Sequence, residues 1–330
     1  MGTRTLKRNT IAGKQCAPSR SGCSCFTLKE LKSIVKHYNR SILSDHRQGG
    51  SSSLIRYNTK NKKKLWADID AKMQATTSCS TELCWAYQHP QTHALISTAF
   101  RPSMPATWFT NKTEWLSTTD IQNVMKQYEN SHKGFYFAGA VPVDFESPAG
   151  NGQLGKCIVQ ALCNVQIHRW WNQGIRQVGI VYNLDPHDEP GSHWVSSFVD
   201  LENNCVYYYD AFGTEQPYEI NRFMESIASQ LEEFHNEPCT VRTNDIRHQF
   251  KNTECGVYSM YFIASMLDGV AYDEFVTNGL NDTQMNKHRH VFYNTLRQYE
   301  NGSLPQQGMI GGGRVREYKQ KKTTKRKMTK

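Results

Sequence analysis

The sequence is poor in apolar residues and contains no long apolar run. Of its 330 residues only 38% are hydrophobic, whereas 11% are aromatic. A low apolar share is typical of a chain with polar flanks, while this aromatic share favours a packed interior. No apolar stretch approaches the roughly 18–20 residues that cross a bilayer, and Gly2 is followed by Leu6 where a myristoylation signal has Ser or Thr. The sequence therefore predicts neither a membrane span nor a lipid anchor.

Cysteine is also scarce. Ten cysteines in 330 residues are too few for a disulfide-stapled scaffold. Residues 1–25 contain five basic side chains and no apolar core, unlike a secretory leader. We therefore expect a reducing compartment. The closely spaced pairs Cys79/Cys84 and Cys157/Cys163 are not followed by His at zinc-knuckle spacing, so we expect no metal and no other cofactor.

Acidic residues are scarce at both ends of the chain, and the net charge of +9 is unevenly distributed. Residues 1–66 hold 15 Lys/Arg and 2 Asp/Glu, residues 314–330 hold 9 and 1, and residues 67–313 hold 15 and 27. An acidic body thus has two basic ends, which are the candidates for contact with DNA through phosphate neutralisation. The candidate residues of the tail are Lys319, Lys321, Lys322, Lys325, Arg326 and Lys327. A solvated solubility tail and a nuclear-targeting signal remain alternatives.

The patterning divides the chain into four parts. We expect a flexible basic arm over 1–26, a helical N-terminal extension over 27–111, a larger domain over 112–300 and a disordered basic tail over 301–330. Apolar periodicity predicts helices at 27–38, 66–73, 81–87, 118–128, 156–171, 218–235 and 256–267, and strands at 135–145, 177–182, 193–201, 205–209 and 240–242. This order predicts an α+β fold, with a mixed central sheet packed against helices.

Four residues of the larger domain could together perform nucleophilic catalysis. Cys255 begins the apolar segment 256–267, and a thiolate is favoured at a helix N-terminus, although a free Cys is usually a buried small hydrophobe. His193 begins one predicted strand and Asp210 ends the next, so Asp210 could orient the His193 ring. Gln249 precedes Cys255 by six residues and could donate its amide to an oxyanion. Each residue alone also fits a structural role in a turn, the core or the surface.

The order and local sequence of these four residues resemble the ubiquitin-like-protein proteases. The matching motifs are HW at His193, YYYD-x-F at Asp210, and Gln249 followed by five residues and Cys255-Gly256. This family, clan CE of the cysteine proteases, includes SUMO-specific proteases and the adenovirus maturation protease. Trp115-Leu116 resembles the start of its WLND motif, and segment 282–299 resembles its closing helix. The resemblance covers about residues 112–300 and is strongest to thiol proteases of nucleocytoplasmic large DNA viruses, such as the asfarvirus polyprotein-processing enzyme.

The resemblance implies a clan CE fold with the nucleophile at the N-terminus of a buried helix. It implies that Cys255 attacks the scissile carbonyl, His193 transfers the proton, Asp210 orients His193 and Gln249 completes the oxyanion hole. Trp194 and Gly256 would line a narrow channel that favours Gly-Gly before the cut. The expected substrates are polyproteins or capsid precursors of a virus, and the expected locations are the virion and the host cytoplasm, with the nucleus as an alternative.

Several alternatives remain open from the sequence. An isopeptidase for SUMO or a ubiquitin-like protein is the first, but Asp120 lies two positions later than the Asp of WLND, which argues against SUMO recognition. A clan CE acetyltransferase and a non-enzymatic nucleic-acid-binding virion protein are the others. The pairs Gly49-Gly50 and Gly311-Gly312 could be self-processing sites, although flexible-linker glycine is the commoner explanation.

Overall fold

The computed structural model describes residues 16–20, 22–44, 54–77, 79, 81–150 and 156–294. The chain divides into two units, Met1–Thr295 and Leu296–Lys330, and every described residue lies in the first. Both Gly-Gly pairs, residues 1–15 and the basic tail with its five candidate lysines and one candidate arginine lie outside the described residues. Among the described helices, none combines the length and the apolar character needed to cross a membrane.

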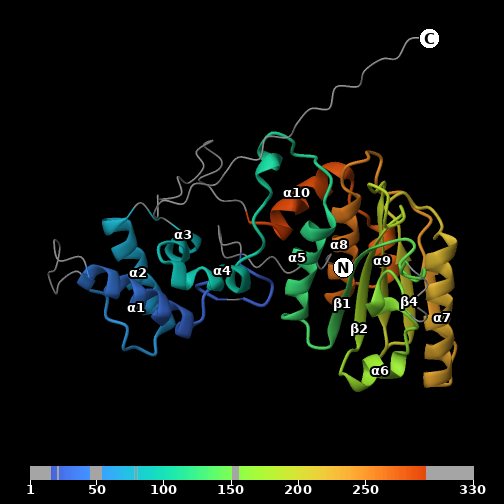
Figure 1. Cartoon of the computed structure of the whole chain (residues 1–330), viewed down its shortest axis with the longest axis horizontal. Helices are drawn as coiled ribbons and strands as arrows, with labels where there is room; N and C mark the ends of the chain where they lie inside the picture. The colour runs from blue at the N-terminus through green and yellow to red at the C-terminus, as the bar shows by residue number, and fades with distance from the viewer. Residues whose placement is uncertain are drawn as a thin grey trace, which may run out of the picture. The chain divides into compact units, whose positions relative to one another are not determined.

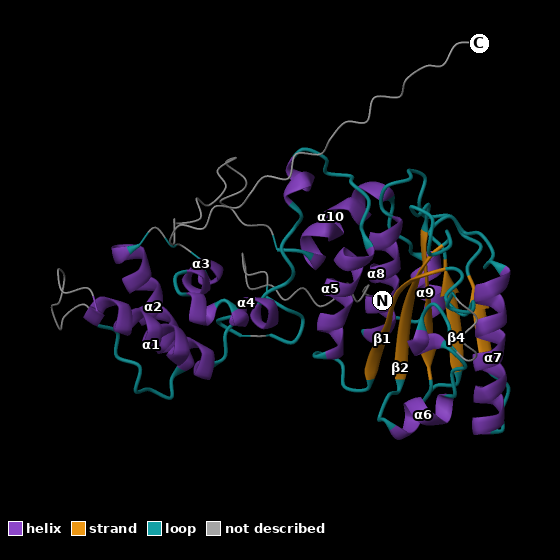
Figure 2. Ribbon diagram, in the orientation of Figure 1, coloured by secondary structure: helices purple, strands orange, loops and turns teal. Residues whose placement is uncertain are grey.

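A five-stranded mixed sheet forms the centre of the larger domain (Figures 1 and 2). Its strands are β1 (Phe135–Pro142), β2 (Gln177–Asn183), β3 (Trp194–Asp200), β4 (Cys205–Tyr209) and β5 (Thr240–Thr243), and they lie in this order across the sheet. The β2–β3 and β3–β4 pairs are antiparallel, whereas β1–β2 and β4–β5 are parallel. The predicted α+β class with a mixed central sheet is confirmed.

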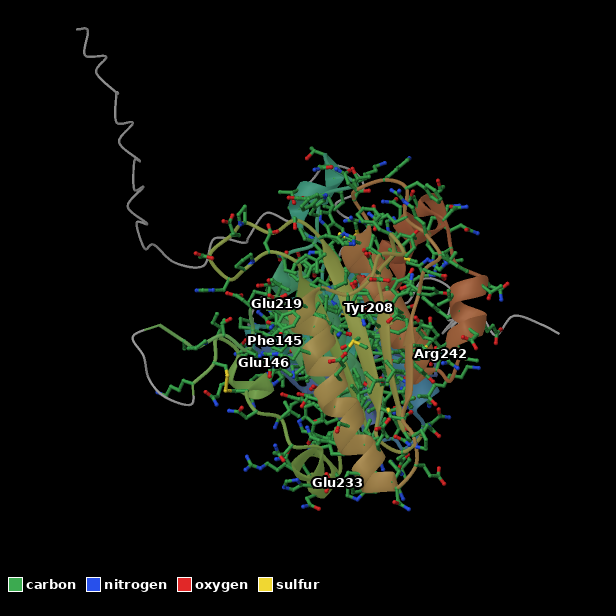
Figure 3. All side chains as sticks on the ribbon, turned by 90° about the vertical axis from the view of Figure 1, so that its right-hand side faces the viewer. Phe145, Glu146, Tyr208, Glu219, Glu233 and Arg242 are labelled. Carbon is green, nitrogen blue, oxygen red and sulfur yellow. A yellow bond between two sulfur atoms is a disulfide. The ribbon has the colours of Figure 1, made fainter. Side chains whose placement is uncertain are left out.

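Helices cover both faces of this sheet because its middle strands are apolar on both sides. β3 is buried along its whole length. Its residues Trp194 and Phe198 join the core beneath a first set of helices, whereas Val195 and Val199 join the core beneath a second set on the opposite face. The first set of helices is α5 (Thr118–Glu129), α8 (Cys255–Leu267), α9 (Tyr272–Thr277) and α10 (Asp282–Phe292). The second set is α6 (Ile167–Asn172) and α7 (Tyr218–His235), and Figure 3 shows α7 from Glu219 to Glu233 in front of the sheet.

The segment before the larger domain is helical, as expected. It contains α1 (Leu28–Ser44), α2 (Lys62–Thr76), α3 (Glu82–Tyr87), α4 (Ala94–Ala99) and short 3₁₀ turns at Pro90–Thr92 and Ala106–Phe109. Thr27 and Glu30 form a capping box, since each side chain bonds the other residue's backbone N–H. Leu31, Ile34, Val35 and Tyr38 bury one face of α1.

Two sequence-based expectations, one about the N-terminal arm and one about the cysteines, differ from the structure. Residues 16–26 are not a flexible arm throughout, because Cys16, Cys25 and Phe26 are buried and Cys16 pairs with Phe100. The expected reduced state differs as well, since disulfides join Cys16 to Cys25, Cys79 to Cys84 and Cys157 to Cys163. Sequence spacing alone does not distinguish a bridged pair from two thiols.

The helix predicted over 156–171 is largely wrong. The structure has a 3₁₀ turn at Gln160–Leu162 and then α6. Asn164 between them adopts a φ of 52°, which interrupts a right-handed helix. Leu162 and Ile167 still bury their side chains, although no continuous helix carries them.

Candidate active site

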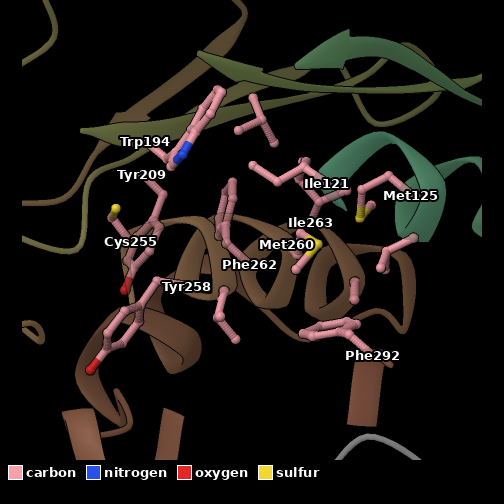
Figure 4. Close-up of a cluster of buried hydrophobic side chains, with 14 of the residues drawn as sticks. Ile121, Met125, Trp194, Tyr209, Cys255, Tyr258, Met260, Phe262, Ile263 and Phe292 are labelled. Carbon is pink, nitrogen blue, oxygen red and sulfur yellow. The ribbon is translucent and has the colours of Figure 1, made fainter. Parts of the chain in front are cut away.

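The candidate nucleophile lies where the sequence places it, at the first residue of α8. Cys255 is 3% exposed, and its thiol is not bridged. Figure 4 shows it at the end of the helix, with Tyr209 and Tyr258 nearby. Backbone N–H groups at a helix start have no helical acceptor, so this position favours a thiolate or an adjacent anion.

The strand register explains why His193 and Asp210 meet. β3 and β4 are antiparallel, with Ser196 opposite Tyr209. His193 immediately precedes β3 and Asp210 immediately follows β4, so both side chains belong to the same end of the sheet. The His193 Nε2 atom lies 2.6 Å from Asp210 Oδ1. Since Nε2 is engaged, Nδ1 is the nitrogen left to face the Cys255 side chain, which is close enough to raise the pKa of His193.

The surroundings of His193 stabilise its charged form. Burial opposes the charge, but hydrogen bonds to Asp210 and Cys255 and the negative charge of both partners raise the pKa of His193 to about 9. Burial likewise raises the pKa of Asp210, yet the hydrogen bond and charge of His193, with further bonds from Thr214 and Phe212, lower it overall. The geometry thus favours an imidazolium between the Asp210 carboxylate and the Cys255 sulfur.

Asp210 is fully buried and is fixed by groups that sequence reasoning missed. Its carboxylate accepts hydrogen bonds from the Phe212 backbone N–H at 2.9 Å and from the Thr214 hydroxyl. The Asn244 side chain accepts from the Asp210 backbone N–H at 2.9 Å and donates to its carbonyl at 2.7 Å. Asn244 immediately follows β5, and the parallel register of β5 with β4 places it beside the residues that end β4, but no motif in the sequence identifies it.

Gln249 is buried in the loop that leads to Cys255, and its role stays a prediction. Its Nε2 donates to the Lys251 carbonyl, and its Oε1 has no hydrogen-bond partner. One amide N–H therefore remains for another acceptor. The backbone N–H groups of His248 and Gln249 both donate to the Ala211 carbonyl, at 2.9 and 2.8 Å. These bonds fasten the Gln249 loop beside the end of β4.

Trp194 and Gly256 meet at the start of α8, next to the nucleophile. The Trp194 indole N–H donates to the Leu116 carbonyl at 2.9 Å. A Cβ on Gly256 would lie 3.1 Å from Leu116 Cδ1 and 3.3 Å from Trp194 Cδ1. The structure therefore brings both predicted channel residues together and fixes the indole beside Cys255.

The tail residues of the predicted nucleic-acid contact lie outside the described residues. A thiol, an imidazole and a carboxylate in this arrangement on an α+β fold define the class of cysteine peptidases.

Comparison with known proteins identifies the family. Residues 165–299 match the model of the Ulp1 protease family, C-terminal catalytic domain. The chain is 31% identical over 294 residues to a protein of Acanthamoeba polyphaga mimivirus whose name assigns it to the thiol proteases; the match covers 84% of this chain and 92% of the relative. The chain belongs to the Ulp1 protease family and is a cysteine-type peptidase.

Two further similarities concern African swine fever virus. A cysteine protease of this virus is 27% identical to this chain over 249 residues, which cover 70% of this chain and 89% of the relative. The crystal structure of a protease from the same virus superposes with a TM-score of 0.58 at 20% identity, covering 86% of this chain and 97% of that one. This second similarity confirms the fold.

Proposed function

We propose that the protein cleaves viral structural polyproteins after Gly-Gly sites during virion maturation, with Cys255 as nucleophile. The Cys255 sulfur bonds to the scissile carbonyl carbon, and the resulting oxyanion accepts hydrogen bonds from the α8 N-terminus and Gln249. As the C–N bond breaks, the His193 imidazolium gives its proton to the leaving amine. Water, deprotonated by His193, then hydrolyses the thioester and regenerates the thiol.

The observation that carries this mechanism is the position of His193. Its Nε2 is hydrogen-bonded to buried Asp210, and Cys255, facing the rest of the ring, raises the pKa of His193. One ring thus connects the orienting carboxylate to the nucleophile at the start of α8, which is the order of contacts that nucleophilic catalysis requires.

The preference for glycine is supported by the apolar wall beside Cys255. The Trp194 indole, hydrogen-bonded to the Leu116 carbonyl, lies so close to Gly256 that a Cβ there would be 3.3 Å from Trp194 Cδ1. A substrate residue passing this wall fits best without a side chain. The polyprotein substrate is supported by the viral origin of the relatives, and it would place the enzyme in the virion and the host cytoplasm.

SUMO deconjugation is the second candidate, because African swine fever virus relatives that are 38% identical over 117 residues are named SUMO-1 cysteine proteases. One contact disfavours it. The Asp120 carboxylate accepts from the Ser117 backbone N–H and hydroxyl at 2.8 and 2.7 Å, in the capping box of α5. Asp120 is therefore engaged within its own helix.

One experiment separates these functions. The purified full chain is given a peptide with Gly-Gly before the cut, the same peptide with Ala-Ala, a SUMO C-terminal reporter and acetyl-CoA. We expect cleavage of the Gly-Gly peptide alone, and none by Cys255→Ala or His193→Ala. Turnover of the SUMO reporter alone, or of acetyl-CoA alone, would contradict the maturation function.

We also propose that the basic ends bind nucleic acid without sequence preference. Within the described residues, Lys29, Lys32, Lys36 and Arg40 follow helical spacing on α1, opposite its buried face, over about 16 Å. The nearby Glu30 is already paired with Arg20. A stripe of cations at this length suits a phosphate backbone.

Deletion of 314–330 and charge removal at the four α1 positions test the two ends separately. We expect each change to weaken binding to a duplex of arbitrary sequence and to reduce its salt dependence, without affecting peptide cleavage. Binding that is unchanged in the variant combining both changes would exclude the proposal.

A further inference from the structure

Four side chains form a continuous stack that begins at the general base. The His193 and Phe212 rings are nearly parallel, with centroids 4.3 Å apart and planes at 8°. The Arg247 guanidinium lies 5.0 Å from the Phe212 ring centre and 5.1 Å from that of Phe250. Phe212 lies in the turn that follows β4, which the Gly213 N–H closes by donating to the Asp210 carbonyl at 2.9 Å, so the first step of the stack joins this turn to the residue before β3.

The same arginine also contacts the loop of the predicted oxyanion donor. Arg247 Nε donates to the Gln249 backbone carbonyl at 2.7 Å. This bond closes a tight turn between Arg247 and Gln249. The planar guanidinium of Arg247 can contact an aromatic ring and bond a carbonyl at the same time, which a lysine ammonium cannot do in the same geometry.

The two loops that carry this stack are packed closely together. Gly213 has a φ of 71°, and a Cβ there would lie 2.9 Å from the Asp245 carbonyl oxygen. Phe212 is therefore held against the Arg247 loop by backbone contact. Arg247 thus contacts both the ring that stacks on His193 and the backbone of Gln249.

We propose that Arg247 is a positioning residue that fixes the position of the His193 ring relative to the Gln249 loop. It does not touch the reacting atoms. It acts through Phe212 on the base and through the Gln249 carbonyl on the oxyanion donor. This inference rests on the proposed roles of Cys255, His193 and Gln249, and it assigns a function to an exposed arginine that motif comparison does not select.

The test compares Arg247→Ala and Arg247→Lys with a matched control, Arg242→Ala. Arg242 is an exposed arginine of β5 whose guanidinium bonds only its neighbour's carbonyl, at 3.5 Å, among the hydrogen bonds of the described residues. Cleavage of the Gly-Gly peptide gives kcat and KM. The rate of Cys255 alkylation by iodoacetamide, read from the mass of the Cys255 peptide, reports thiolate activation without any substrate.

We expect Arg247→Ala to lower kcat about tenfold with KM unchanged, because a displaced base and oxyanion donor slow chemistry more than binding. Cys255 alkylation should slow as well, and Arg247→Lys should resemble Arg247→Ala. Phe212→Leu should give a similar loss, and the two losses should not add in the double variant. Thermal unfolding of each variant checks that the fold is retained.

Three results would overturn the inference: kcat and alkylation rates equal to those of Arg242→Ala, full rescue by lysine, or additive losses in the double variant. The proposed substrate is tested independently, since failure of the Gly-Gly peptide leaves the alkylation comparison intact. A wild-type Cys255 that alkylates no faster than a peptide thiol would instead contradict the catalytic roles themselves.

Discussion

The charge on His193 sets the upper limit of the pH range in which the site can work. Its pKa of about 9 means that the imidazolium persists at neutral pH and is lost as the pH rises through 9. Because this pKa is raised on folding, the ion pair with Asp210 stabilises the protein fully below about 6.5 and loses this effect through about 9.

Asp210→Asn should therefore move the alkaline limb of kcat/KM toward lower pH. The neutral amide no longer stabilises the imidazolium, so the pKa of His193 falls toward its ordinary value. We also expect kcat/KM to fall on the order of 10²-fold or more, because the ring loses its fixed tautomer. A pH–rate profile measures both effects. Asp144→Asn, which removes the exposed pair with His187, is the control, and an alkaline limb common to both variants would refute the assignment.

Gln249→Ala tests the oxyanion donor. Removing one such donor typically lowers kcat on the order of 10²-fold, and the same loss is expected here with little change in KM. Gln74→Ala, which changes an exposed amide on α2, should have no effect. If single-turnover rates of Gln249→Ala equal those of the wild type, its amide does not contact the oxyanion.

A buried ion pair joins two elements at the nucleophile. Arg289 of α10 lies 2.7 Å from Glu254, the residue before Cys255, and the two side chains are only 2% and 1% exposed. Asn286 of α10 donates to the same carboxylate at 2.8 Å, and Arg289 lies over the Trp108 ring. The start of α8 is therefore fixed from α10, far along the chain.

Breaking this pair should destabilise the protein strongly. Glu254→Gln leaves the Arg289 cation buried without an anion, which typically costs about 3–5 kcal/mol. Urea denaturation measures the change in the free energy of unfolding. The exposed pair of Arg222 and Glu146 provides the control, since Glu146→Gln should cost less than about 1 kcal/mol. Equal effects of the two substitutions would show that burial does not strengthen the first pair.

The elements were predictable where a pattern repeats over several turns or alternates along a strand. The predicted helix over 218–235 matches α7 residue for residue, because its amphipathic stripe continues for its whole length. The predicted helix over 156–171 failed because Asn164 interrupts it locally. Apolar spacing does not detect one residue with positive φ.

For the molecule as a whole, motif spacing selected residues that the structure places together, and it did not select the residues that contact them. His193, Asp210 and Cys255 come together as predicted. Asn244 is placed beside Asp210 by the β4–β5 register, and Arg247 contacts Phe212 and the Gln249 carbonyl from a loop; neither contact leaves a periodic signal in the sequence. Cysteine pairing was missed for a related reason, since bridged and free cysteines share the same one-letter pattern.

The cysteine pairing gives the last prediction. Alkylation of the unfolded, non-reduced protein should modify the four cysteines outside the disulfides, Cys23, Cys205, Cys239 and Cys255, and leave the six bridged cysteines unmodified. The bridges span 9, 5 and 6 residues, so each should stabilise the fold by about 2–3 kcal/mol through the entropy of the unfolded chain. Reduction should therefore lower the free energy of unfolding while leaving kcat unchanged, because no bridge includes Cys255. Peptide mass spectrometry gives the pairing directly, and modification of all ten cysteines before reduction would instead support the reducing compartment that the sequence predicts.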